Sequence, residues 1–216
     1  MDKTHKLIIL GISAIAEIAY EYFTYDSPYE VVAFCVDRDY LTQDSLVGLP
    51  VVPFEEVQNT YTPFDHSFFA ATNYNQMNAL RKRFYTEMKA KGYAPASYIS
   101  TRAFVWRNCQ IGEHCFIFED NTVQPFVKIG NNVVLWSGNH IGHHTVIKDH
   151  VFVSSHVVIS GFCNIGESCF MGVNSTLANN ITIGNDCVIG AGALVVGDVP
   201  DNQTVVGLWK KQRQAT

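Results

Sequence analysis

Positive charge is scarce in this chain, above all in its second half. The 216 residues contain 15 Lys and Arg against 20 Asp and Glu, which gives a formal net charge of −5. Between residues 103 and 200 the only Lys and Arg residues are Arg107, Lys128 and Lys148, and a short basic tail begins at Lys210. Proteins that bind nucleic acid neutralise its phosphates with a basic surface. The composition therefore predicts no nucleic-acid partner, and any phosphate bound by the second half must rely on backbone N–H groups, these few side chains or the tail.

Long hydrophobic runs are also missing. No apolar stretch reaches the length of about 20 residues that a helix needs to cross a bilayer. The opening residues Met-Asp-Lys-Thr-His-Lys, followed by a short apolar run, do not have the pattern of a secretory signal peptide. These absences predict a cytoplasmic protein with no membrane insertion.

Cysteine pairs with metal-binding spacing are absent as well. The chain has six cysteines but no CxxC pair. Five of them recur at small-residue positions of the repeat described next, and Cys35 lies in an apolar run. Cysteine at such positions behaves as a small hydrophobic residue. We therefore expect reduced, buried thiols and no metal site.

A repeat extends from Ile99 to Val195, where every sixth residue is aliphatic (once a methionine) without a break. Neither the 3.6-residue period of a helix nor the alternation of a strand produces this spacing. A six-residue period is typical of a parallel β-helix, in which three hexapeptides close one triangular coil and residues eighteen apart stack. We expect a left-handed β-helix, the hand known for hexapeptide proteins.

Glycine often follows the aliphatic residue of the repeat. We attribute these glycines to the unusual backbone angles that a corner of the coil requires. They are Gly112, Gly130, Gly142, Gly166, Gly172, Gly184 and Gly190.

The first part of the chain has a different pattern. Strands are predicted at 7–10, 30–36, 48–52 and 68–72, and helices at 13–22, 54–61 and 75–91. Alternating strands and helices indicate a small Rossmann-like α/β unit with a parallel sheet. We place this unit at residues 1–96 and the β-helix at 97–216.

The glycine fingerprint of dinucleotide-binding folds is absent from this α/β unit. The turn after the first strand, Gly11-Ile12-Ser13-Ala14, keeps only the first glycine. That disfavours a dinucleotide, because the later glycines let the backbone approach a pyrophosphate. The turn at Gly11, Ile12 and Ser13 together with Asp37 could still bind one nucleotide, and Asn73 and Asn75 are weaker candidates.

Histidines cluster in the repeat, where five of the eight fall between residues 140 and 156. His143 lies at a corner, and Gly161 lies eighteen residues later on the same corner, about 4.8 Å away by the spacing of adjacent strands. A free N–H at Gly161 beside the His143 imidazole would suit acyl transfer, with a general base and an oxyanion donor. His144, His150 and His156 fall on three different sides of the coil, so we expect structural roles for them.

The whole chain resembles the bacterial nucleotide-amino-sugar N-acetyltransferases, which belong to the sialic-acid O-acyltransferase-like family of hexapeptide proteins. The motifs that carry the resemblance are the opening strand–turn–helix, Phe34-Cys35-Val36-Asp37, Gly48-Leu49-Pro50-Val51, Ser137-Gly138-Asn139-His140-Ile141-Gly142-His143, His156-Val157-Val158-Ile159-Ser160-Gly161 and Ile189-Gly190-Ala191-Gly192-Ala193.

The resemblance implies a homotrimer in which acetyl-coenzyme A lies between adjacent β-helices and the first domain binds the nucleotide-linked amino sugar. It assigns the general base to His143 and the N–H at the thioester carbonyl to Gly161. Cofactor contacts are expected at Gly161, Gly190 and Ala191, and from Trp209 and Lys210 at the end of the coil. Trp209 could stack on adenine or cap the coil. Many relatives have an acid before the base, where this chain has Gly142.

Three alternatives stay open. An O-acetyltransferase of the same fold would also need a histidine base. A γ-carbonic-anhydrase-like zinc hydratase would use histidines from two subunits, but it leaves the α/β unit without a role. An inactive binding or scaffold protein is compatible with the missing acid.

Overall fold

The computed structural model describes residues 2–210, with the side chain of Asn75 excepted. The chain divides into two compact units, Met1–Tyr98 and Ile99–Thr216. This division falls two residues after the boundary expected from the sequence.

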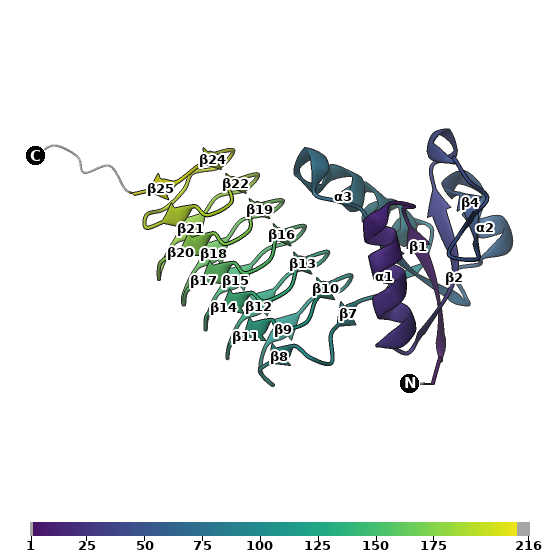
Figure 1. The fold of residues 1–216 in the computed structure, drawn as a ribbon, viewed down its shortest axis with the longest axis horizontal. Helices are drawn as coiled ribbons and strands as arrows, with labels where there is room; N and C mark the ends of the chain where they lie inside the picture. Colours follow the sequence, from purple (N-terminus) through teal and green to yellow (C-terminus); the bar gives the residue numbers. More distant parts are fainter. Residues whose placement is uncertain (1, 211–216) are drawn as a thin grey trace, which may run out of the picture. The chain divides into compact units, whose positions relative to one another are not determined.

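The first unit is built from alternating strands and helices (Figure 1). Its strands are β1 (His5–Leu10), β2 (Tyr29–Val36), β3 (Ser45–Leu46), β4 (Leu49–Pro53), β5 (His66–Ala70) and β6 (Ala94–Pro95). Its helices are α1 (Ala14–Tyr25), α2 (Val57–Thr60) and α3 (Asn75–Ala90), with short 3-10 turns at Arg38–Tyr40 and Phe54–Glu56. The backbone is left-handed at Gln76, Met77 and Asn78, so the regular part of α3 begins after them.

The sheet of this unit runs in the order β3-β4-β2-β1-β5-β6. All neighbours pair in parallel except β3 and β4. The buried strand β1 lies between β2, which follows it in sequence, and β5, which comes later, so the strand order reverses at β1. Ligands of open α/β sheets bind beyond the carboxyl ends of the strands at such a reversal. The predicted Rossmann-like unit is confirmed.

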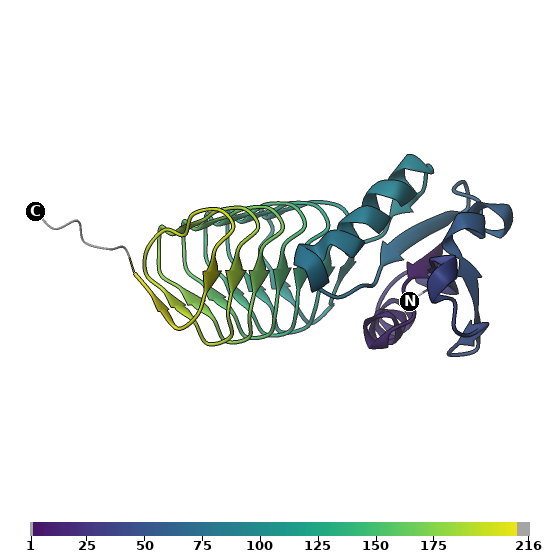
Figure 2. The same ribbon diagram turned by 90° about the horizontal axis from the view of Figure 1, so that it is seen from above.

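The second unit is a parallel β-helix with three faces (Figures 1 and 2). The first face contains β7 (Tyr98–Ile99), β10 (Phe116–Ile117), β13 (Val134–Leu135), β16 (Phe152–Val153), β19 (Phe170–Met171), β22 (Val188–Ile189) and β24 (Thr204–Val205). The second contains β8 (Phe104–Val105), β11 (Thr122–Val123), β14 (His140–Ile141), β17 (Val158–Ile159), β20 (Thr176–Leu177), β23 (Leu194–Val195) and β25 (Leu208–Trp209). The third contains β9 (Gln110–Ile111), β12 (Lys128–Ile129), β15 (Val146–Ile147), β18 (Asn164–Ile165) and β21 (Thr182–Ile183).

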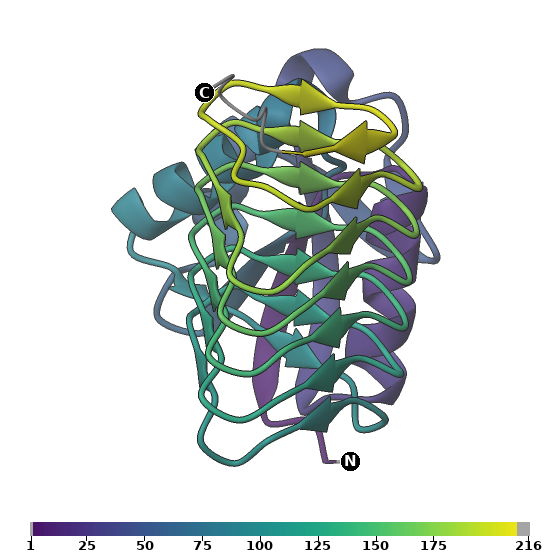
Figure 3. The same cartoon turned by 90° about the vertical axis from the view of Figure 1, so that its left-hand side faces the viewer.

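Strands of successive coils lie in register, as Figure 3 shows along the stack. On the second face, for example, His140 pairs with Val158 and Ile141 with Ile159, eighteen residues apart. The predicted left-handed hexapeptide β-helix is confirmed.

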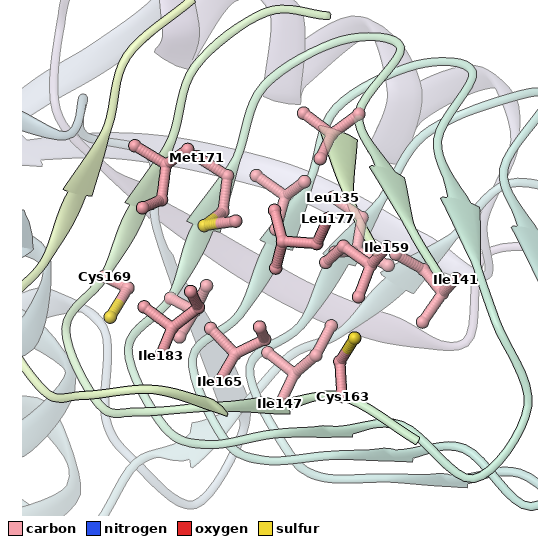
Figure 4. Packing of buried hydrophobic residues seen from close by; sticks show 14 of the residues in the cluster. Leu135, Ile141, Ile147, Ile159, Cys163, Ile165, Cys169, Met171, Leu177 and Ile183 are labelled. Atoms are coloured by element: carbon pink, nitrogen blue, oxygen red, sulfur yellow. The ribbon is translucent and has the colours of Figure 1, made fainter. Parts of the chain in front are cut away.

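The interior of the β-helix is the aliphatic ladder read from the sequence. Ile141, Ile159 and Leu177 are fully buried and point into the coil, and Cys163 and Cys169 belong to the same interior cluster (Figure 4). Five of the six cysteines are buried, Cys109 is half-buried, and all are reduced. Burial raises the pKa of the Cys169 thiol to about 12, which keeps it protonated and unreactive at neutral pH.

The corners of the coil differ from the expectation in one respect. The glycines that follow the aliphatic positions do not have left-handed backbone. The left-handed residues lie two positions after that glycine position and are mostly Asn, Asp, His and Phe, among them His144 with φ of 59°. The reason given for those glycines is therefore wrong. A Cβ on Gly142 would lie 2.5 Å from the backbone nitrogen of Gly161 in the next coil, so close packing between coils excludes a side chain.

No helix within the described residues is long and apolar enough to cross a bilayer.

Candidate functional site

The α/β unit has a cavity of about 440 Å³ beyond the carboxyl ends of β1, β2 and β5. Its lining includes Gly11, Ile12 and Ser13 after β1, Asp37 after β2, and Asn73 after β5. The structure thus brings five of the six residues predicted to bind a nucleotide to one place. The sixth, Asn75, has a side chain outside the described residues.

Gly11 shapes the floor of this cavity. Its φ is +120°, and a Cβ there would lie 2.6 Å from the carbonyl oxygen of Ala71 at the end of β5. Its N–H donates to the carbonyl of Cys35, at the end of β2. Glycine therefore lets the three strand ends meet closely enough to form one site. Ser13 occupies the N-cap position of α1, but its hydroxyl makes no capping hydrogen bond.

Asp37 is paired in the structure. The Arg83 guanidinium of α3 donates to Asp37 Oδ2. The guanidinium also lies over the ring of Phe84, with 4.4 Å between its carbon and the ring centroid. Arg83 was not predicted, because nothing in the sequence pairs residues so far apart. The exposed ring of Tyr40 and the side chain of Phe84 also line the cavity, and both were missed.

The second group of candidate residues lies at the corner that follows β14 in the β-helix. His143 is exposed there, and Gly161 lies beside it in the next coil. An ideal Cβ on Gly161 would be 2.9 Å from both Cε1 and Nε2 of His143, so the Nε2 edge of the imidazole faces Gly161. Gln124 fixes this turn from the preceding coil, because its Oε1 accepts the backbone N–H of His143 at 3.0 Å.

The N–H of Gly161 is not free. It donates to Oδ1 of Asn179 at 3.0 Å, so the expectation of an unoccupied donor is wrong for this structure. The same hydrogen bond, from a backbone N–H to an Asn side chain one coil later, recurs in the β-helix. Asn131 accepts from the N–H of Glu113, and Asn185 accepts from that of Glu167. Asn179 lies eighteen residues after Gly161, so the stacking rule applied once more would have found it.

His144 was assigned a structural role, but it contacts His143. Their Nδ1 atoms are 3.1 Å apart. The His144 ring also stacks between Phe126 and Phe162, with centroid distances of 4.6 and 4.7 Å. The eighteen-residue spacing of these three aromatic rings was visible in the sequence and was overlooked.

An acid before the base is sterically excluded here. Position 142 admits only glycine because of the close approach of Gly161, as described above. The group that touches Nδ1 of His143 is instead the His144 imidazole.

The remaining predicted cofactor contacts do not gather at this corner within one chain. Gly190 and Ala191 follow β22 on the first face, and the Gly190 N–H donates to the Val205 carbonyl. Trp209 packs against the interior cluster, and its Nε1 donates to the Asp198 carbonyl at 3.1 Å; both contacts fit the capping role. Lys210 is exposed at the end of the second face.

Other histidines of the repeat pack or form hydrogen bonds within the β-helix. The His156 ring lies against Gly138, where a Cβ would be 2.6 Å from its atoms. His114, Asn132 and His150 form a buried row in which each hydrogen bond measures 2.9 Å. Among the described residues of one chain, no group of three His, Cys, Asp or Glu side chains could hold a metal ion.

Comparison with known proteins finds proteins with the same repeats and the same fold. Residues 108–142, 126–161 and 162–197 match the model of the bacterial transferase hexapeptide family. The acetyltransferase domain of PglB from Neisseria gonorrhoeae FA1090 superposes with a TM-score of 0.85 at 26% identity, covering 94% of this chain and 97% of that one. A structure of the same domain with acetyl coenzyme A gives 0.85 at 25% identity, with coverage of 96% and 97%.

Two further structures share the fold. The perosamine N-acetyltransferase from Caulobacter crescentus, in complex with CoA and GDP-perosamine, has a TM-score of 0.83 at 22% identity and covers 94% and 93% of the two chains. WeeI from Acinetobacter baumannii AYE has a TM-score of 0.72 at 20% identity, with coverage of 94% and 97%. No curated protein sequence gives a significant match. The chain is therefore an acyltransferase that has the bacterial transferase hexapeptide repeats over residues 108–197, and the fold of its two units is similar to that of the PglB acetyltransferase domain.

Proposed function

We propose that this protein is an acetyl-CoA-dependent N-acetyltransferase that acts on the amino group of a nucleotide-linked deoxyamino sugar. The observation that carries the proposal is the pairing of His143 with Gly161 at an exposed corner, in a chain whose other unit has a cavity at its strand ends. The similar PglB domain has been solved with acetyl coenzyme A, and the perosamine enzyme with CoA and a GDP-linked sugar.

His143 is the general base of the proposed reaction. The amine of the sugar forms a bond to the thioester carbonyl carbon, and the carbon–sulfur bond to CoA breaks. The Nε2 of His143 accepts the proton that the amine loses, and it is the ring edge that faces the open space beside Gly161. A neutral imidazole is suited to this transfer near neutral pH.

The oxyanion donor requires a change at Asn179. The Gly161 N–H can stabilise the developing charge only after Oδ1 of Asn179 has moved away. Replacement of Asn179 by Ala should then leave kcat close to the wild-type value. If kcat instead falls by about 100-fold, the scale for a lost oxyanion donor, the side-chain amide of Asn179 rather than Gly161 serves the oxyanion.

The cavity of the α/β unit is the proposed nucleotide site. Its only charged lining side chain among the described residues is Asp37, which can accept hydrogen bonds from a base or ribose. The turn at Gly11, Ile12 and Ser13 leads into the N-terminus of α1, a favourable position for phosphate oxygens because helix N–H groups point outward there.

A homotrimer is part of the proposal. The second face of the β-helix and the residues just after its strands expose large apolar side chains, which a lone coil would leave in water. They are Phe104, Trp106, Val158, Leu194, Val196 and Leu208. His143 lies at the edge of this face, so packing through it would place a neighbouring β-helix beside the proposed base. A stable monomer in sedimentation at micromolar concentration would exclude this arrangement.

The proposed activity is tested by thiol release from acetyl-CoA with a panel of UDP-, dTDP- and GDP-linked amino sugars. Matched sugars that carry a hydroxyl in place of the amine serve as controls. We expect turnover with an amino sugar and none with its hydroxyl counterpart. Turnover of the hydroxyl sugars would indicate an O-acetyltransferase, and stoichiometric zinc with carbon dioxide hydration and no thiol release would indicate the hydratase.

A further inference from the structure

The contact between His143 and His144 has a chemical consequence. Their Nδ1 atoms lie 3.1 Å apart and the two rings are perpendicular, with an interplanar angle of 89°. A hydrogen bond between two imidazole nitrogens needs one proton, so one Nδ1 must donate and the other must accept. The tautomers of the two rings are therefore coupled, because when one Nδ1 carries the shared proton the other does not.

His144 is held in place by aromatic rings. It stacks on Phe126 with an interplanar angle of 26° and on Phe162 with 17°. Phe162 also meets the His143 ring edge to face, with 5.0 Å between centroids. All three stacked residues have left-handed φ values, so their rings lie above one another at the same corner of three coils. This column keeps Nδ1 of His144 directed at His143.

No charged side chain competes for the pair from the neighbouring coils. Residues 124–127 are Gln-Pro-Phe-Val and residues 160–163 are Ser-Gly-Phe-Cys. The one titratable group among them, the Cys163 thiol, donates to the Ala178 carbonyl at 3.2 Å and is buried. Within the described residues, His144 is thus the titratable group that contacts His143.

We propose that His144 is a positioning residue that selects the active tautomer of His143. Neutral His144 accepts the proton of His143 Nδ1–H, which leaves a lone pair on His143 Nε2, the atom that faces Gly161. A protonated His144 donates from its own Nδ1 instead. Neutral His143 then carries its proton on Nε2 and has no lone pair there to act as a base. This inference rests on the proposed function, because it concerns the base of that reaction.

Two substitutions at position 144 test the proposal. His144→Phe retains the stack, since Phe126 and Phe162 already adopt this backbone conformation, but removes the acceptor. His144→Asn keeps an oxygen where Nδ1 stood and suits left-handed backbone, as Asn180 does at the equivalent corner. His156→Asn, at a left-handed corner that does not touch His143, is the matched control.

We expect His144→Phe to lower kcat at pH 8 about tenfold, the scale for loss of an orienting partner, with KM unchanged. His144→Asn should recover most of kcat, because its oxygen can accept the proton of His143 Nδ1–H. Unaltered kcat in both variants would show that His144 only packs at the corner.

The tautomers can be read without activity. In the wild-type protein, 15N chemical shifts of the imidazoles at pH 8 should report the proton of His143 on Nδ1, and in His144→Phe a mixture of both tautomers. If no acetyl acceptor is found, the proposed function fails while this measurement still decides the role of His144. A His143 proton on Nε2 in the wild-type protein would overturn the inference.

Discussion

The two units build their sites in different ways. In the α/β unit, Gly11, Asp37 and Asn73 come from three separate strand ends and meet because the strand order reverses at β1. In the β-helix, His143 and Gly161 meet because the chain returns to the same corner after eighteen residues. One site depends on the order of the elements, and the other depends on residue spacing alone. The two should therefore respond differently to substitution.

The largest effect is expected from a charge placed inside the coil. Ile159 is fully buried in the interior ladder, and Ile159→Asp would leave a carboxylate there without a partner. We expect a loss of about 4–5 kcal/mol in the free energy of unfolding, measured by urea denaturation. Asn164→Asp is the matched control, because its side chain is exposed on the third face, outside the surface proposed for the trimer. Equal losses in the two variants would contradict the inward and outward alternation.

The next effect concerns the site that depends on spacing. His143→Ala should lower kcat by about 10²–10⁴, the usual scale for a lost general base. Binding of acetyl-CoA should change little, because the imidazole is assigned to the acceptor amine. Steady-state kinetics and calorimetry check both quantities, with His156→Ala as the control. Near-normal turnover at neutral pH would remove His143 from the mechanism and make His144 the next candidate.

Asp37 tests the site that depends on strand order. Asp37→Ala should weaken binding of the nucleotide sugar about tenfold, equivalent to about 1.4 kcal/mol, and leave the affinity for acetyl-CoA unchanged. Arg83→Met separates two explanations, since Arg83 donates to the same carboxylate. A similar loss in Arg83→Met would mean that the ion pair positions Asp37. Unchanged calorimetric affinity in Asp37→Ala would reduce this residue to a turn former.

An effect of alkaline pH is shared by both units. Burial raises the pKa of Cys169 from 9.0 to about 12, and it raises that of Cys35 in the α/β unit as well. At pH values between 9.0 and about 12, the folded protein keeps the thiol proton of Cys169, which the unfolded chain has lost. The free energy of unfolding therefore falls as the pH rises above 9. The slope should be about 1.4 kcal/mol per pH unit for each such thiol.

The alkaline effect is measured by urea denaturation at pH 8 to 10.5. Cys169→Ala should reduce the slope of the free energy of unfolding against pH by about 1.4 kcal/mol per pH unit. At pH 8 the variant is less stable than the wild-type protein, because a buried side chain has been removed. Parallel curves for the wild-type protein and this variant would rule out Cys169 as a source of the slope.

The sequence predicted most of the fold because both units follow short-range rules. The six-residue ladder located each coil, and the alternation of apolar runs with turns located β1, β2 and β5 within a few residues. The reason for the glycines was missed, since a clash such as that between position 142 and Gly161 depends on the distance between coils rather than on local backbone angles.

The candidate site was only partly predictable for a related reason. Sequence spacing placed His143 beside Gly161, and strand ends brought Asp37 near Gly11. Side-chain partners were harder to foresee. Arg83 reaches Asp37 from a helix far along the chain, and the orientation of the Asn179 amide depends on which N–H lacks a backbone acceptor.

The stacking of one coil on the next also bears on how the chain folds. In the β-helix each strand pairs with one that lies a single coil away, as His140 does with Val158. In the α/β unit, Leu7 pairs with Ser67, so strand β1 is fully paired only after a contact between residues far apart in the sequence has formed. Chains with nearby contacts order faster than chains with distant ones, and stacked repeats can grow from any formed segment. We therefore expect the first unit to be the slower of the two to fold, even though it leaves the ribosome first.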